Sequence, residues 1–93
     1  MSSDTQASEQ EIAAKVRDVL RSHARLPVDV DELTDEADLF RAGMTSHASV
    51  SVMLALEDSF DLEFPDRMLT RQMFERVSSI RSAISELMAE RGK

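Results

Sequence analysis

The 93-residue sequence contains no cysteine, no tryptophan and no tyrosine, and it has only two glycines and two prolines. Without cysteine, the chain can form no disulfide, hold no metal through a thiolate and perform no chemistry with a thiol of its own. Few glycines and prolines are typical of helices joined by a few loops, and they fit poorly with a strand-rich barrel or sandwich. We therefore expect an all-α fold, in a single domain because the chain is too short for a second core.

Further absences concern location and partners. No apolar stretch is long enough to span a bilayer, and the N-terminal MSSDTQASEQ has neither the basic start nor the apolar run of a signal peptide. We therefore expect a cytoplasmic protein that does not bind membranes. The net charge of −7 opposes binding to nucleic acid, whereas it suits a partner with a basic surface or simply favours solubility. The acidic run that starts at Asp29 lacks the glycine and the final glutamate of a calcium loop, so we expect a solvated loop and no metal site.

Hydrophobic spacing predicts four helices over residues 9–91, and the polar residues 1–8 are expected to be flexible. A capping box of Ser8 and Glu11 should start the first helix, and this helix should end by about Arg25 because Pro27 cannot continue it. Its apolar stripe is formed by Ile12, Val16, Val19, Leu20 and a partly packed His23.

The rest of the chain should form one long loop and three more helices. The loop over residues 26–45 is too long for a simple connector, and three apolar side chains should pin it to the core: Leu33, Leu39 and Phe40. Residues that favour helix starts mark the other elements. These are Thr45 for a helix over 46–60, Pro65 for a short third helix to about residue 72, and Ser78 or Ser79 for the last helix.

Ser46 is the residue placed best for chemistry. It lies in the first turn of a predicted helix, just after Gly43 and the capping Thr45, where a phosphate ester would meet free backbone N–H groups and the positive end of the helix dipole. On the residues alone, a mere extension of the cap is the favoured interpretation of Ser46. A nucleophile–base pair with His47 is disfavoured because neighbours on a helix do not face each other, and no nucleophile elbow surrounds the serine. We expect a protein that is not an enzyme.

Four short elements of the sequence occur in a characteristic order. They are Asp38-Leu39-Phe40, Gly43-Met44-Thr45-Ser46-His47, Leu56-Glu57-Asp58-Ser59-Phe60 and Phe64-Pro65-Asp66. With this order and spacing, residues 10–90 resemble the acyl carrier protein family. The resemblance implies a four-helix bundle with a short third helix and a long loop between the first two helices. It also implies that a phosphopantetheinyl transferase esterifies Ser46 with 4′-phosphopantetheine, whose terminal thiol holds a cargo as a thioester and supplies the thiol that the chain lacks.

Two neighbours of Ser46 depart from the usual family pattern. Thr45 replaces the usual aspartate and His47 replaces the usual leucine, and the helix starts with few acidic residues. The run Gly-Met-Thr-Ser-His-Ala-Ser-Val looks more like the standalone bacterial aminoacyl carrier proteins. Their ATP-dependent amino acid:[carrier protein] ligases resemble class II, seryl-type aminoacyl-tRNA synthetases. An acyl carrier for fatty-acid or polyketide groups, or a helical interaction module without a prosthetic group, are the alternatives.

Family precedent also implies which residues surround the attachment site. The arm would lie near Gly43, Met44, Thr45 and His47, and partner proteins would read a surface made of Val50, Met53, Ala55, Arg67 and Met68. The expected state is a monomer that passes its cargo to an unspecified downstream acceptor or transferase.

Overall fold

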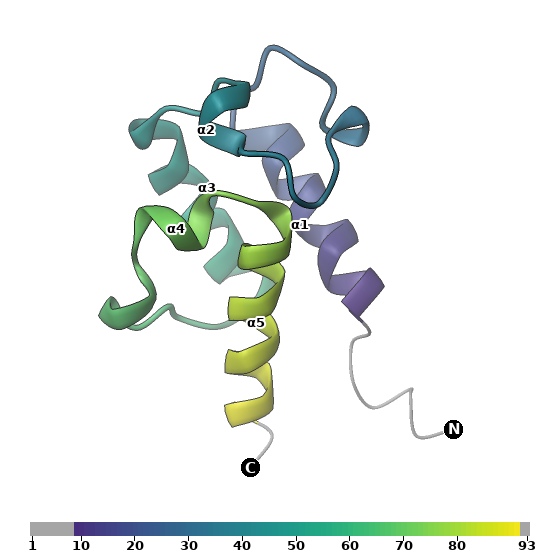
Figure 1. The fold of residues 1–93 in the computed structure, drawn as a ribbon. Helices are drawn as coiled ribbons and strands as arrows, with labels where there is room; N and C mark the ends of the chain where they lie inside the picture. The colour runs from purple at the N-terminus through teal and green to yellow at the C-terminus, as the bar shows by residue number, and fades with distance from the viewer. Residues whose placement is uncertain (1–8, 92–93) are drawn as a thin grey trace.

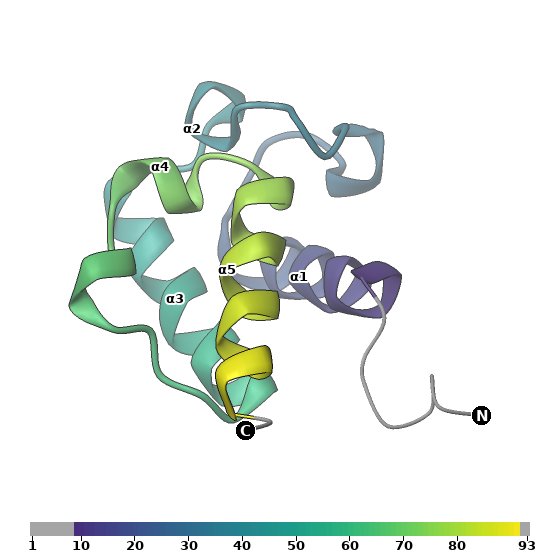
Figure 2. The same cartoon turned by 60° about the horizontal axis from the view of Figure 1, so that its bottom comes forward.

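Three helices of 15 residues each form the frame of the fold: α1 (Glu9–His23), α3 (Ser46–Phe60) and α5 (Val77–Arg91). The computed structural model describes residues 9–91, so the expected flexible segment 1–8, with Ser8 of the capping box, lies outside the described residues. Helix α1 packs against both α3 and α5 (Figures 1 and 2). Between residues 9 and 91 every regular element is a helix, which confirms the all-α prediction.

The apolar stripe of α1 enters the core as predicted, except at its last position. Ile12, Val16, Val19 and Leu20 are all buried. His23 is exposed, so its predicted packing is wrong. The helix ends at His23, and the next residue, Ala24, occupies the buried position with none of its surface exposed.

The segment between α1 and α3 is more structured than a plain loop. It contains a 3-10 turn, η2 (Val30–Glu32), and a four-residue helix, α2 (Leu39–Ala42). The predicted anchors hold, since Leu39 is fully buried while Leu33 and Phe40 pack against the core. The Leu39 N–H also donates to the Glu75 carbonyl oxygen at 2.7 Å, which ties the segment to the chain just before α5. Figure 1 shows α2 at the end of the molecule where α5 begins.

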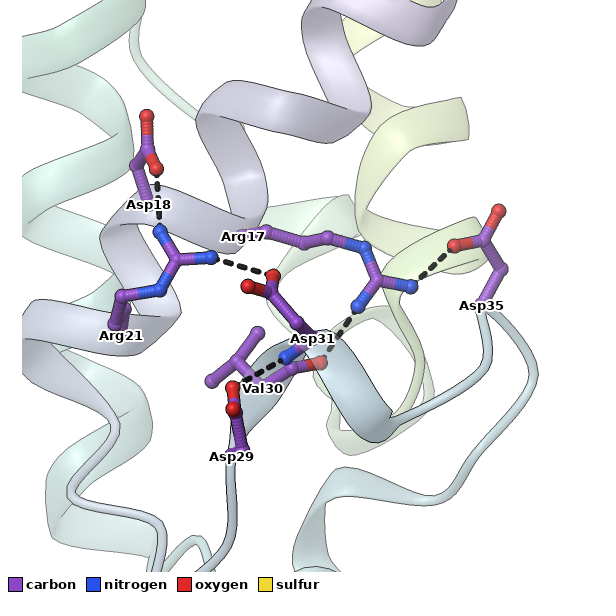
Figure 3. A network of polar contacts seen from close by, with 7 residues as sticks. All are labelled: Arg17, Asp18, Arg21, Asp29, Val30, Asp31 and Asp35. Carbon is purple, nitrogen blue, oxygen red and sulfur yellow. Dashed lines mark hydrogen bonds and ion pairs between the residues drawn. The ribbon is translucent and has the colours of Figure 1, made fainter.

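Ion pairs, and not solvation alone, explain the acidic residues of this segment. The Arg17 guanidinium of α1 donates to the Val30 carbonyl oxygen and to Asp35 Oδ1, both at 2.7 Å, and Arg81 of α5 donates to Asp35 Oδ2 at 3.1 Å (Figure 3 for Arg17). The hydrogen bond from Arg17 holds the pKa of Asp35 below its usual value. Asp31 pairs in the same way with Arg21 at 2.6 Å. The predicted solvated loop is therefore a segment clamped to α1 and α5.

The predicted third helix is divided into two short pieces, η3 (Asp66–Met68) and α4 (Arg71–Phe74). The break falls at Thr70, whose extended backbone (φ −121°) places its side chain to cap α4 by accepting the Met73 N–H at 3.2 Å. A single helix from Pro65 to residue 72 is therefore wrong in detail, although a short helical third element is present.

The start of α5 also differs from the prediction. The helix begins at Val77, so Ser78 and Ser79 lie inside its first turn and neither is the N-cap residue. Ser79 still serves the helix end, because its hydroxyl oxygen accepts the Arg76 N–H at 3.1 Å. This is the reach-back half of a capping box, in which the third helical residue satisfies the backbone N–H of the cap position.

Candidate functional site

The site is built on the turn that leads into α3. Thr45 is the N-cap, as predicted, and its Oγ1 accepts the Ala48 N–H at 3.0 Å. Gly43 ends α2 with φ +126°, a conformation that residues with a side chain rarely adopt. A Cβ at Gly43 would lie 2.7 Å from Pro27 Cδ, so the close passage of these two segments also requires glycine. The turn thus has one backbone path, and that path places Ser46 as the first residue of α3.

Ser46 is exposed, and its hydroxyl group is unpaired among residues 9–91. Within the described residues its hydroxyl has no hydrogen-bond partner, and the N–H groups of Ser46 and His47 donate to no protein acceptor. Three features that favour a phosphate ester therefore coincide at this residue: access for a modifying enzyme, unpaired backbone donors and the positive end of a 15-residue helix.

A groove of about 470 Å³ opens beside Ser46. One wall comes from the exposed and half-buried face of α3, and the other comes from α2, α4 and the link before α4. Nine residues line it, most of them apolar: Phe40, Ser46, Ser49, Val50, Met53, Leu69, Thr70, Arg71 and Phe74. A flexible arm attached to Ser46 would start at the edge of this groove.

The structure brings together only part of the expected neighbourhood. Thr45 and His47 flank Ser46 and are exposed, whereas the Met44 side chain is only 3% exposed and belongs to the core. Val50 and Met53 line the groove with Ser46.

The other predicted partner residues lie elsewhere. Ala55 lines no part of the groove. It follows Met53 by two residues, which correspond to about 200° around a helix, so the two side chains lie on opposite borders of the buried face of α3. Arg67 of η3 turns to α5, where it pairs with Glu86 and Glu90, and Met68 packs against the core near the same helix.

The second wall of the groove was not predicted from the sequence. Leu69, Thr70 and Arg71 fell inside a helix predicted from residue 65 to residue 72, and Phe40 and Phe74 had no pattern that places them beside Ser46. Thr70, a residue that favours helix starts, is the one usable signal in the sequence for the break before α4.

Other kinds of site find no support in the described part of the chain. His47 is exposed and follows Ser46 directly, which gives no base–nucleophile geometry. No group of three His, Asp or Glu residues between residues 9 and 91 is arranged to hold a metal ion. Over the same residues, no helix is both long enough and apolar enough to cross a membrane.

Comparison with known proteins agrees with this geometry. Residues 10–87 match the family described as phosphopantetheine attachment site. The chain belongs to this family. The aminoacyl carrier protein of Agrobacterium fabrum (strain C58) is 41% identical over 75 residues, which are 81% of this chain and 90% of that protein. The chain is accordingly a carrier protein and not an enzyme, and its prosthetic group is phosphopantetheine.

Solved structures agree with the family assignment. A carrier protein from Agrobacterium tumefaciens, crystallised with an engineered Bradyrhizobium japonicum glycine:[carrier protein] ligase and ATP, matches with a TM-score of 0.78. It shares 42% identity, over 80% of this chain and 96% of that one. A solution structure of a protein from Agrobacterium tumefaciens matches with a TM-score of 0.70 and 39% identity, over 86% of this chain and 96% of that one. The fold is therefore that of a carrier protein, as the sequence elements predicted.

Proposed function

We propose that Ser46 carries the phosphopantetheine and that the cargo is an amino acid, loaded by an ATP-dependent amino acid:[carrier protein] ligase that resembles a class II aminoacyl-tRNA synthetase. One comparison carries the proposal for the cargo: the matching carrier from Agrobacterium tumefaciens was crystallised with a glycine:[carrier protein] ligase. The carrier domain is proposed to span residues 9–91 and to act as a monomer in the cytoplasm, where ATP and the transferase would be available.

The residues around Ser46 fit the prosthetic group. The serine hydroxyl is exposed and unpaired, the first N–H groups of α3 are free to stabilise a phosphate, and the groove has room beside the attachment point. When attached, the group supplies a terminal thiol that holds the amino acid as a thioester, which is attacked more easily than an ordinary ester. The role of the protein is to present Ser46 to the transferase and the loaded arm to its partners.

The surface for these partners is proposed to lie on the exposed side of α3 and across the groove. Val50, Leu54 and Leu69 are 51%, 56% and 39% exposed, and exposed apolar residues that gather on one face are typical of a binding surface. Val50 and Leu69 face each other across the groove that also contains Ser46. An enzyme that reaches Ser46 would therefore contact this surface at the same time.

Attachment at Ser46 is tested by co-expression with a broad-specificity phosphopantetheinyl transferase. Because the chain has no cysteine, the thiol titre of the denatured protein should rise from zero to one per chain, together with a mass gain of one phosphopantetheine. Ser46→Ala should abolish both changes, whereas Ser49→Ala, one turn further along the same groove, should keep them. A gain that survives Ser46→Ala would overturn the assignment.

The cargo is tested by loading the holo protein. Offered an amino acid, ATP and an amino acid:[carrier protein] ligase, it should form an aminoacyl thioester that intact mass detects and neutral hydroxylamine removes. Loading by fatty-acyl or polyketide synthetases alone would overturn the aminoacyl proposal and leave the carrier assignment intact. Leu54→Ala should lower the rate of loading, and Val28→Ala, which truncates an exposed apolar residue outside α3 and the groove, should not.

A further inference from the structure

Arg71 is the only charged side chain among the nine residues that line the groove beside Ser46. It is the first residue of α4, and its guanidinium carbon lies 4.0 Å from the centre of the Phe40 ring of α2. This stacking distance lies well inside the range of a cation–π contact. The aromatic ring therefore holds the charge at the wall of the groove, although Arg71 itself is exposed.

Arg71 lacks an acidic partner in a chain that has many acids. Five other arginines of the described residues form ion pairs: Arg17, Arg21, Arg67, Arg76 and Arg81. Over residues 9–91 no carboxylate lies within ion-pair distance of Arg71, and its N–H groups donate to no protein acceptor. In a chain with a net charge of −7 and 18 acidic residues, such an arginine presents an unused set of donors in the groove that the attachment residue also lines.

We propose that Arg71 binds the phosphodiester of the prosthetic group attached to Ser46. The guanidinium fork matches phosphate oxygens, and stacking on Phe40 reduces the freedom that the side chain would lose on binding. The free N–H groups at the start of α3 would meet the same anion from the Ser46 side. No acidic side chain lines the groove to oppose it. This inference rests on the proposed attachment at Ser46 and adds the residue that positions the arm.

Two other roles would use the same arginine. It could serve only as a packing link between α2 and α4 through Phe40, or it could meet an acidic side chain of a partner protein. Neither role requires Arg71 to respond to the prosthetic group in the isolated holo protein. That response is therefore the property to measure.

The experiment compares apo and holo protein by NMR, after intact mass has shown that each holo sample carries the prosthetic group and that each apo sample lacks it. In the wild type, the ³¹P signal of the phosphodiester should depend on salt, and the Arg71 Nε–H signal should shift between the apo and holo forms. In Arg71→Gln, the fraction of phosphodiester groups in contact with the side chain at position 71 should fall about two- to fivefold, which is the range expected for an exposed ion pair. The salt dependence of the ³¹P signal should decrease as well. Phe40→Leu, which keeps the charge but removes the aromatic face, should give an intermediate value.

Arg41→Gln is the matched control. Arg41 is an exposed arginine of α2 next to Phe40 in sequence, and it lines no part of the groove. The Arg41→Gln variant should give the same ³¹P signal and salt dependence as the wild type.

Equal ³¹P signals and salt dependence in wild type, Arg71→Gln and Arg41→Gln would overturn the proposal. If Arg71→Gln does not fold, an Arg71 Nε–H signal that is identical in wild-type apo and holo protein decides against it. A mass that shows no prosthetic group on Ser46 contradicts the proposed function instead, so the two failures can be told apart.

Discussion

Replacing Gly43 by alanine tests whether the turn before Ser46 has only one backbone path. Alanine at φ +126° and ψ 0° should be disfavoured by about 1–2 kcal/mol, because an L side chain crowds the neighbouring carbonyl there. The new Cβ would also meet Pro27 Cδ at 2.7 Å and Cγ at 3.2 Å. The ring is rigid, but Pro27 is exposed, so we take the steric part as about 1 kcal/mol, the low end of the overpacking range. We expect a total loss of about 2–3 kcal/mol.

A double-mutant cycle separates the two contributions. Urea unfolding is followed by far-ultraviolet circular dichroism, because the chain has no tryptophan or tyrosine to report by fluorescence. Pro27→Ala removes the ring, so Pro27→Ala/Gly43→Ala should recover about 1 kcal/mol relative to the sum of the single variants and keep the loss due to φ. A loss below about 0.5 kcal/mol for Gly43→Ala would refute the argument from φ, since that part has no way to relax. No coupling in the cycle would refute the steric part.

Three further predictions concern the cap, the ion pairs and the core, each measured by the same unfolding assay. Thr45→Ala should lower the free energy of unfolding by about 1 kcal/mol, because the Ala48 N–H loses its acceptor. Thr45→Asp should stay within a few tenths of a kcal/mol of the wild type or exceed it. Equal stability of the wild type and both variants would contradict the assignment of Thr45 as the cap. Asp35→Asn should lose about 0.5–1 kcal/mol at pH 7, a small value because the Asp35 side chain is 41% exposed, and Glu36→Gln in the same segment should lose nothing measurable. The pKa of Asp35 is lowered in the folded state, so this stabilisation is fully present above the unfolded pKa of about 3.9 and is lost as the pH falls through the folded pKa. A stability difference between wild type and Asp35→Asn that grows as the pH is lowered below about 3.9 would contradict this argument. Leu56→Ala, at a position with no exposed surface, should lower the free energy of unfolding by about 2–5 kcal/mol. Leu54→Ala, at 56% exposure on the same helix, should change it by no more than about 0.5 kcal/mol. Similar losses for the two variants would contradict the assigned faces of α3.

Local features of the fold and site could be predicted from the sequence because they depend on residues that are close together in the chain. The stripe of α1 repeats at helical spacing, so its four aliphatic residues were assigned to the core without any knowledge of what they pack against. Thr45 caps α3 three residues before Ala48, and this contact needs only the backbone of one turn. Ser46 follows from that cap, since the first residue of a helix is presented at its end.

Features that join distant segments were decided by the tertiary structure. Asp35 meets Arg17 and Arg81, which lie 18 and 46 residues away, so the segment before α3 read as a solvated loop when its neighbours were unknown. The same holds for Met44, which periodicity could not assign to the core because it lies outside any helix and is buried by the closure of that segment. Contacts of this kind depend on which segments meet in the folded chain, and periodicity reveals the buried face of a helix but not its partner.

The carrier class was determined by the sequence itself, through the order of short elements around a capped serine. The groove beside that serine was determined only when α2 and α4 came to lie against α3. Phe40 and Arg71 are 31 residues apart in the chain, yet the Arg71 guanidinium carbon lies 4.0 Å from the centre of the Phe40 ring and places a positive charge in the groove that Ser46 also lines. A cap is a property of one helix turn, whereas a groove is a property of surfaces that only the folded chain brings together.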